Sequence, residues 1–207
     1  MRRTRLLVAA LVSLPALAGA QGPASTGASV AGGLDQNYQV SYTFGGTSTA
    51  FTNANVLPLV FGGTFGPGAV GIAASSTGSL PGGSPDSFFT RFGYTFRTTF
   101  TGGSATGFTY RCAVDDTFIS VVLNGAVVAG AGCDQYALNT TFTVTGFVSG
   151  TNVLEFNATG NGTTDSFALR VASVTMSAVP EPGTWALLGT GLLAVGGVAR
   201  RRRTSVV

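Results

Sequence analysis

The sequence predicts an all-β domain, an antiparallel β-sandwich, with an apolar segment near each end of the chain. Between residues 21 and 178, apolar and polar side chains alternate along several short runs, which is the period of a strand and not of a helix. Gly, Asn and Ser separate these runs, and none of the runs has a helical period. Many short strands without helices are typical of a sandwich.

The composition excludes several kinds of chemistry. Of 207 residues, 31 are Gly and only 9% are charged, and there is no His and no Lys. Without them the chain can form no Ser-His or Cys-His nucleophile pair, no imidazole metal ligand and no Schiff-base lysine. The formal charge of +3 comes from arginines at the two ends, because the body over 21–179 has four Arg against seven acidic residues. An acidic body without a basic cluster cannot neutralise phosphates, so we expect no nucleic-acid partner.

The first twenty residues have the three parts of a secretory signal peptide. A basic start precedes an apolar run over 6–17, and small residues follow the run. Ala18 and Ala20 occupy positions −3 and −1 of the expected cleavage site, and Gln21 would begin the mature chain. An uncleaved anchor is the alternative, but the apolar run is short for one.

A second apolar segment, 185–199 (WALLGTGLLAVGGVA), lies near the other end. Four arginines follow it directly: Arg200, Arg201, Arg202 and Arg203. As a helix the segment would extend about 22 Å against a hydrocarbon thickness of about 30 Å, so it predicts a single, marginal transmembrane helix. Since positive residues stay in the cytoplasm, the body would lie outside. A buried core helix is the alternative, but the glycines weaken it.

Four residues before this segment add a motif: Val179, Pro180, Glu181 and Pro182. The order of P-E-P, short apolar run and arginine block over 179–203 resembles the PEP-CTERM sorting signal of Gram-negative bacteria that export polysaccharide. This resemblance implies an inner-membrane intermediate from which an exosortase removes the tail. It also implies that the body reaches the cell envelope, the outer surface or the extracellular space, in the context of exopolysaccharide.

Two runs in the body show the clearest strand pattern. In the first, Phe92, Tyr94 and Phe96 share one face and Gly93, Thr95 and Arg97 the other. In the second, alternation predicts Phe108, Tyr110, Cys112 and Val114 inward and Thr109, Arg111 and Ala113 outward. Further strands are expected at 38–44, 118–123, 126–129, 141–145, 153–158 and 167–176.

Turn residues define how some of these strands connect. Asn124 and Gly125 supply the two positive φ angles of a type I′ turn and predict a hairpin between 118–123 and 126–129. Residues 45–84 are rich in Gly, Ser, Thr and Pro, and they predict long loops with one or two irregular edge strands.

Cys112 and Cys133 are the only cysteines. Export would place them in an oxidising compartment, where a disulfide is the default. Closing a loop of this size would stabilise the fold by about 3 kcal/mol in the loop-entropy model. Two thiolates on a metal are the alternative, but no His or further Cys completes such a site, so no metal site is expected.

A second resemblance covers about 60 residues of the body. Asp115 and Asp116 precede a strand that ends in Asn-Gly, and the G-x-N-x-L-x-F run over 150–156 is expected to return beside that strand. This order, with the strand around 142–144 between, resembles the second half of a galactose-binding-like jelly roll. Many sugar-binding modules share that architecture, although a fold does not carry a function.

Asp115 and Asp116 are also the obvious carboxylate pair for a hydrolase. Adjacent strand residues point to opposite faces, so the two are badly placed as the acid and nucleophile of a glycosidase. We expect them to cap a turn or to accept backbone amides, with Ca²⁺ binding as a weaker alternative and no cofactor otherwise. Glu155 is expected to be exposed, opposite the apolar residues of its strand.

Sugar binding would require an exposed aromatic ring, for which the sequence offers three candidates: Phe89, Tyr136 and Phe147. Asn139, Asn157 and Asn161 lie in N-x-T sequons and are expected to be turn and strand residues, not glycan acceptors. The sequence therefore favours a non-enzymatic exported envelope or matrix protein with a domain over 21–178. A carbohydrate-binding module is the second hypothesis and a glycan hydrolase the third.

Overall fold

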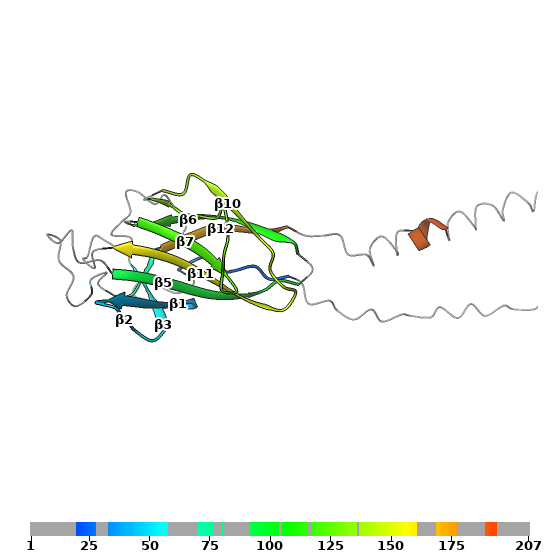
Figure 1. Cartoon of the computed structure of the whole chain (residues 1–207). Coiled ribbons are helices and arrows are strands. Elements are labelled where there is room, and N and C mark those ends of the chain that lie inside the picture. Colours follow the sequence, from blue (N-terminus) through cyan, green and yellow to red (C-terminus); the bar gives the residue numbers. More distant parts are fainter. Residues whose placement is uncertain are drawn as a thin grey trace, which may run out of the picture.

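The computed structural model (Figure 1) describes residues 20–27, 33–57, 70–76, 80, 92–103, 105–115, 117–135, 137–160, 169–177 and 189–193. Twelve strands lie in these ranges: β1 (Leu34–Phe44), β2 (Thr47–Ser48), β3 (Thr52–Val56), β4 (Ile72–Ala73), β5 (Phe92–Thr101), β6 (Gly107–Val114), β7 (Thr117–Leu123), β8 (Ala126–Val127), β9 (Asp134–Gln135), β10 (Thr141–Thr145), β11 (Thr151–Gly160) and β12 (Leu169–Ser177). The prediction of an all-β domain is confirmed.

The strands form one curled open sheet in the order β10-β6-β12-β4-β3-β1-β5-β11-β7-β8. All pairs are antiparallel except β6 with β9, and β2 extends β1 as a hairpin. The curl places a front layer of β1, β5, β11 and β7 against a back layer of β10, β6 and β12 (Figure 1). The short strands β3 and β4 connect the two layers along one side.

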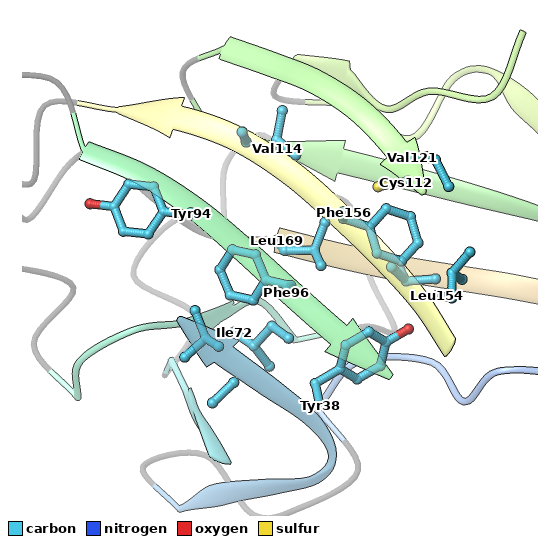
Figure 2. Close-up of a cluster of buried hydrophobic side chains, with 14 of the residues drawn as sticks. Tyr38, Ile72, Tyr94, Phe96, Cys112, Val114, Val121, Leu154, Phe156 and Leu169 are labelled. Atoms are coloured by element: carbon cyan, nitrogen blue, oxygen red, sulfur yellow. The ribbon is translucent and has the colours of Figure 1, made fainter. Parts of the chain in front are cut away.

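The two layers share one hydrophobic core (Figure 2). Tyr110 of β6 meets Phe156 of β11 edge to face, with 5.7 Å between ring centroids, and both side chains are buried. Phe96 of β5 and Leu169 of β12 belong to the same cluster and are also buried. Since aromatic and aliphatic residues from both layers fill one space, the hydrophobic effect holds the curl closed in the manner of a sandwich.

The predicted alternation holds in β5, where the side chains from Phe92 onward are alternately buried and partly exposed. In β6 one prediction was wrong, because Ala113 was expected outward and is fully buried. Ala113 is paired in register with Arg170 of β12 on one side and with Asp134 of β9 on the other. Paired residues share a face, so these two larger side chains flank the small methyl group.

The Asn124-Gly125 turn is confirmed. The φ angles are 49° and 85°, and Leu123 pairs with Ala126 across the turn. The second strand of this hairpin is shorter than expected and ends at Val127, because only two residue pairs form before the chain turns away at a glycine with positive φ, Gly130.

The expectation of edge strands within 45–84 is confirmed for β2, which among the described strands pairs only with β1, but not for β3 and β4. β3 pairs with β1 on one side and β4 on the other, and β4 also pairs with β12, so both lie inside the strand order. The curl explains why β3 and β4 are interior strands. A sheet that folds back over its own core needs strands where it bends from one layer to the other, and these strands must be short. Residues 58–69, 77–79 and 81–84 of this region are outside the described ranges.

Both described ends of the domain lie at the same end of the sheet. Gln21 forms an antiparallel bridge with Thr101, the last residue of β5. Ser177, the last residue of β12, pairs with Gly107, the first residue of β6. We call this end the terminal pole and the opposite end, where β1 finishes and β5 begins, the far pole (Figure 1).

Of the predicted transmembrane segment 185–199, the structure describes residues 189–193, and these are helical. Among the described residues no helix is long and apolar enough to cross a membrane.

Candidate functional site

Several predicted site residues lie outside the described ranges. They are Ala18 of the expected cleavage site; Val179, Pro180, Glu181, Pro182, Arg200, Arg201, Arg202 and Arg203 of the sorting signal; and Phe89, Asp116, Tyr136 and Asn161. The described candidates fall into four places in the fold: the disulfide, the corner at Asp115, the strand β11 and the docked segment 20–27.

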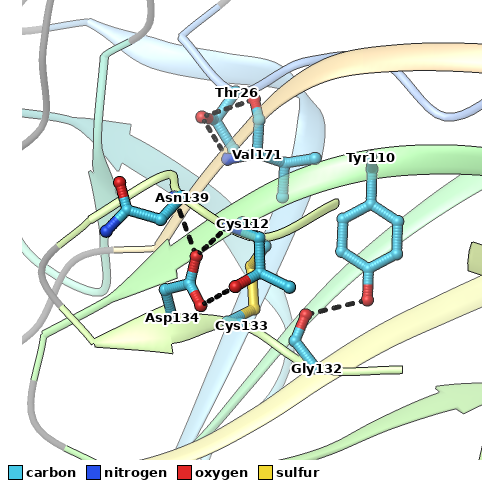
Figure 3. Close-up of a disulfide and its surroundings, with 9 residues drawn as sticks. Thr26, Tyr110, Cys112, Gly132, Cys133, Asp134, Asn139 and Val171 are labelled. Atoms are coloured by element: carbon cyan, nitrogen blue, oxygen red, sulfur yellow. Dashed lines mark hydrogen bonds between the residues drawn. A yellow bond between two sulfur atoms is a disulfide. The ribbon is translucent and has the colours of Figure 1, made fainter. Parts of the chain in front are cut away.

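The predicted disulfide is present (Figure 3). Cys112 lies buried in β6 and Cys133 directly precedes β9, with 4.6 Å between their Cα atoms. The Tyr110 hydroxyl donates to the Gly132 carbonyl at 3.0 Å, beside the bridge. The covalent bond and this hydrogen bond together fasten the segment before β9 to the core strand β6.

Asp134 organises the loop that follows the disulfide. Its carboxylate accepts hydrogen bonds from the amides of Asn139 and Thr140, at 2.9 and 2.6 Å, and from the Thr140 hydroxyl at 2.7 Å. Partial desolvation raises the pKa of Asp134, but these hydrogen bonds to the charged form outweigh it and leave the pKa below its ordinary value. The sequon residue Asn139 is exposed in this loop and lies outside any strand.

Two buried tyrosines have pKa values raised above the ordinary value near 10. For Tyr38 the larger cause is desolvation and the next is the charge of Asp35. For Tyr110 desolvation is again the largest cause. Both phenols therefore stay protonated in the folded state at any physiological pH.

Asp115 occupies the corner between β6 in the back layer and β7 in the front layer. Its side chain is buried, with 3% exposed. The expected role of Asp115 as a turn cap or an acceptor of backbone amides stays a prediction. Within the described ranges, no three His, Cys, Asp or Glu side chains gather where they could hold a metal ion.

The G-x-N-x-L-x-F run forms β11 and lies beside β7, as the second resemblance implied. Its Asn152 is fully buried, and its amide makes four hydrogen bonds. The oxygen accepts from the Val148 amide and from Asn124 Nδ2, and the nitrogen donates to the Val148 and Gly150 carbonyls, all at 2.8–2.9 Å. The asparagine of the motif thus holds the 146–150 loop against the Asn124 turn, a role that sequence reasoning did not assign.

The outward side of the front layer carries one ion pair. Arg97 of β5 and Glu155 of β11 are register partners, and both Arg97 Nε and its terminal nitrogen approach Glu155 Oε1, at 2.9 and 2.7 Å. The Arg97 guanidinium also lies 3.7 Å from the centroid of the Phe51 ring. The prediction that Glu155 is exposed was wrong, because this pairing leaves only 20% of its side chain accessible.

Polar side chains surround this pair. Asn157, next along the outward side of β11, accepts from the Thr95 hydroxyl at 2.7 Å and donates to the Ser120 hydroxyl at 3.2 Å. Gln39 is the register partner of Arg97 on β1 and is exposed. We call the set Gln39, Phe51, Arg97, Glu155 and Asn157 the front-face cluster. It combines a ring, a guanidinium, a carboxylate and two amides on one sheet face.

The prediction that Phe147 is an exposed ring was wrong. It packs against the core, edge to face with Phe100 at 5.3 Å between centroids and 6.0 Å from Phe108. The exposed ring in the described part of the chain is Phe44, 41% accessible at the far pole and stacked on Phe92. The alternation of inward and outward residues in strands could not predict the position of the Phe147 ring. Phe147 lies in the loop before β11, where the Asn152 hydrogen bonds fix the chain.

The segment 20–27, which holds the expected cleavage bond and the first residues of the expected mature chain, is docked on the domain. The Gln21 amide donates to the Thr101 carbonyl at 3.0 Å, and the Gln21 carbonyl accepts from the Thr101 amide at 3.1 Å. Further along, the Tyr38 hydroxyl donates to the Ala24 carbonyl at 2.8 Å. Thr26 exchanges hydrogen bonds with the Val171 backbone in β12. The expected cleavage bond, Ala20–Gln21, therefore lies against folded structure.

Two solved structures show a distant fold similarity to this chain. A GH31 α-xylosidase from Xanthomonas citri is 9% identical with a TM-score of 0.38, over 76% of this chain and 16% of the enzyme. A β-glucosidase from Kluyveromyces marxianus is 9% identical with a TM-score of 0.41, over 70% and 16%. The chain thus spans 16% of the length of these enzymes, and similarities of this size carry no argument about function. A comparison with curated proteins finds no match.

The family comparison addresses the end of the chain. Residues 178–203 match the model of the PEP-CTERM protein-sorting motif, and the match includes Val179, Pro180, Glu181, Pro182 and the arginine block. This motif indicates an exported protein that passes through the membrane, is processed by an exosortase and ends at the cell surface or outside the cell. The chain carries the PEP-CTERM protein-sorting motif directly after the last strand of its β-domain.

Proposed function

We propose that the protein is a non-enzymatic component of the cell envelope or extracellular matrix, associated with exopolysaccharide. A signal peptide over 1–20 starts its export, and a transmembrane segment over 185–199 holds it in the inner membrane until an exosortase acts. The observation that carries the proposal is the sorting motif, which begins one residue after β12 ends at Ser177. The whole folded domain therefore precedes the motif and would be kept after the tail is removed.

Two properties of the body support this proposal. The Cys112–Cys133 bridge suits an oxidising compartment outside the cytoplasm. The absence of His and Lys from the sequence removes the usual general bases and nucleophile partners, which supports a role without catalysis. We also propose that the curled sheet is a jelly roll of the galactose-binding-like type, on the strength of the Asp115 corner and the β11 motif.

Processing can be tested in the exporting host. Wild-type chain, a triple variant with Pro180, Glu181 and Pro182 changed to Ala, and Ser205→Ala as a control outside the matched residues would be fractionated and weighed by intact mass spectrometry. Wild type and Ser205→Ala should lose both ends and appear outside the inner membrane. The triple variant should stay in the membrane with its arginines attached. A wild-type product that keeps Arg200–Arg203 would instead leave a plain single-span anchor.

Carbohydrate binding is the second candidate, and the front-face cluster favours it. Planar side chains such as Arg97, Glu155 and Asn157 can bond pairs of neighbouring hydroxyls, and a ring such as Phe51 can pack on the C–H face of a sugar. The acceptor atom Glu155 Oε2 is not used in the ion pair with Arg97. Arg97, Glu155 and Asn157 come from the adjacent strands β5 and β11 and are held in register by the sheet, and Phe51 directly precedes β3.

The binding test uses the mature domain and the host's own exopolysaccharide. Phe51→Ala and Arg97→Gln should each weaken binding, whereas Phe44→Ala removes an exposed ring at the far pole and should leave binding unchanged. Equal affinity in all three variants would remove this candidate. Glycan degradation that depends on Asp115, tested by Asp115→Asn, would favour the hydrolase hypothesis over both.

A further inference from the structure

The terminal pole brings the two processed ends of the chain together. The Gln21 backbone pairs with Thr101, and Ser177 pairs with Gly107, on either side of the connection between β5 and β6. Gly22 also lies directly against β12, since a Cβ atom there would be 2.7 Å from Met176 Sδ. The first residue expected after signal cleavage and the last residue before the sorting motif therefore share one pole, as the end of β12 and the N-terminal segment do in Figure 1.

The exposed surface of this pole is uncharged in the described ranges. Its one charged side chain there is Asp35, which is fully buried and accepts the amides of Gly27, Asn37 and Tyr38. Two large apolar side chains are exposed at the pole: Leu34, 49% accessible at the start of β1, and Val148, 56% accessible in the loop before β11. Other charged groups, such as the Arg97–Glu155 pair and Asp134, lie farther along the strands.

We propose that the terminal pole is the surface that faces the lipid bilayer while the sorting segment is still in the membrane, so that the far pole points outward. This inference rests on the proposed function, specifically on the membrane-anchored intermediate. An uncharged surface with exposed apolar side chains fits a bilayer interface, because acidic groups would be repelled by anionic headgroups.

The length of the tether supports this orientation. Seven residues, 178–184, separate Ser177 from the apolar segment, and a chain of that length extends at most about 28 Å. The two end Cα atoms of a ten-residue strand such as β5 are about 30 Å apart, which is as long as the fully stretched tether. The far pole could therefore reach the membrane surface only with the tether taut, whereas the terminal pole lies near the membrane at any tether extension.

The test measures fluorescence quenching of single tryptophans in the full chain, reconstituted in phosphatidylcholine–phosphatidylglycerol vesicles with spin-labelled headgroups. The native Trp185 would be replaced with Phe. One probe, Ser149→Trp, lies exposed at the terminal pole, and the matched probe, Thr117→Trp, lies exposed at the far pole. Thr106→Trp and Thr47→Trp repeat the comparison at both poles if either first variant fails to fold.

We expect the terminal-pole probe to be quenched several-fold more strongly than the far-pole probe. Equal quenching of the two probes, in a chain that floats with the vesicles, would overturn the orientation but leave the membrane-anchored intermediate standing. A chain that does not float with the vesicles would overturn both the anchored intermediate and the orientation. A cooperative urea-unfolding transition verifies in each variant that the domain has folded.

Discussion

Gly103→Ala should destabilise the domain through a contact that exists only while Ala20 is still attached. Gly103 adopts a φ of 55°, and a Cβ atom there would lie 2.8 Å from both Cα and Cβ of Ala20 and 2.9 Å from its nitrogen. Real Cβ contacts are not this short, and two of these atoms are backbone. The segment around Gln21 must therefore move away from the pole if the added methyl group is to fit.

Gly45 provides a matched control. Its φ of 56° is almost the same, but a Cβ atom there would meet nothing within 4 Å. Placing a non-glycine residue in this left-handed region costs about 1–2 kcal/mol, and that cost should be common to both substitutions. The difference between the two losses in free energy of unfolding therefore measures the contact with Ala20.

The size of the difference follows from the two hydrogen bonds between Gln21 and Thr101 that the displaced segment would lose. At about 0.5–1.5 kcal/mol each, their loss adds about 1–3 kcal/mol. In a chain that begins at Gln21, as signal cleavage would leave it, the atoms that clash are absent and the extra cost should vanish.

The assay is urea unfolding of both variants and wild type, each in a chain that keeps residues 19–20 and in one that begins at Gln21. The free energy of unfolding should fall more for Gly103→Ala than for Gly45→Ala only in the longer chain. If Gly103→Ala costs the same in both chains, the docking of Ala20 on Gly103 is refuted as the cause.

Three further predictions concern the domain itself. Asn152→Ala removes a side-chain amide that makes four hydrogen bonds, so it should lower the free energy of unfolding in urea by about 2–4 kcal/mol. The control Asn157→Ala, on the outward side of the same strand, should lower it by less than about 1 kcal/mol. Cys133→Ser should cost about 3 kcal/mol, and a reductant should lower wild-type stability by the same amount but leave the variant unchanged. Because burial raises the pKa values of Tyr38 and Tyr110, stability should fall as pH rises above 10, and Tyr110→Phe should reduce that slope by up to about 1.4 kcal/mol per pH unit.

The features that the sequence predicted correctly are local ones. Alternation along β5 depends on residues two apart, and the Asn124-Gly125 turn depends on two neighbouring φ preferences. The Cys112–Cys133 pairing needed no spatial reasoning, because the sequence has no other cysteine. Each of these features depends either on a few adjacent residues or on the number of cysteines in the sequence.

The features that it missed depend on partners far apart in the chain. Ala113 is buried because Arg170, 57 positions later, pairs with it in β12. The interior position of β3 and β4 follows from the curl, which no short window of sequence encodes. Glu155 is partly covered because Arg97 lies opposite it, 58 residues earlier. In each case pairing between distant strands overrides the preference of the single residue.

The composition also limits how the domain responds to its surroundings. A folded protein changes stability with pH only where some group binds protons differently in the folded and unfolded states. This chain has no His, the side chain that normally titrates between about pH 5 and 8. The hydrogen bonds to Asp134 lower its pKa, so its contribution is complete above the unfolded pKa and is lost only as pH falls through the folded one. The raised pKa values of Tyr38 and Tyr110 act only above pH 10. Stability should therefore be nearly constant across the neutral range, which suits a protein that meets the uncontrolled pH outside the cell.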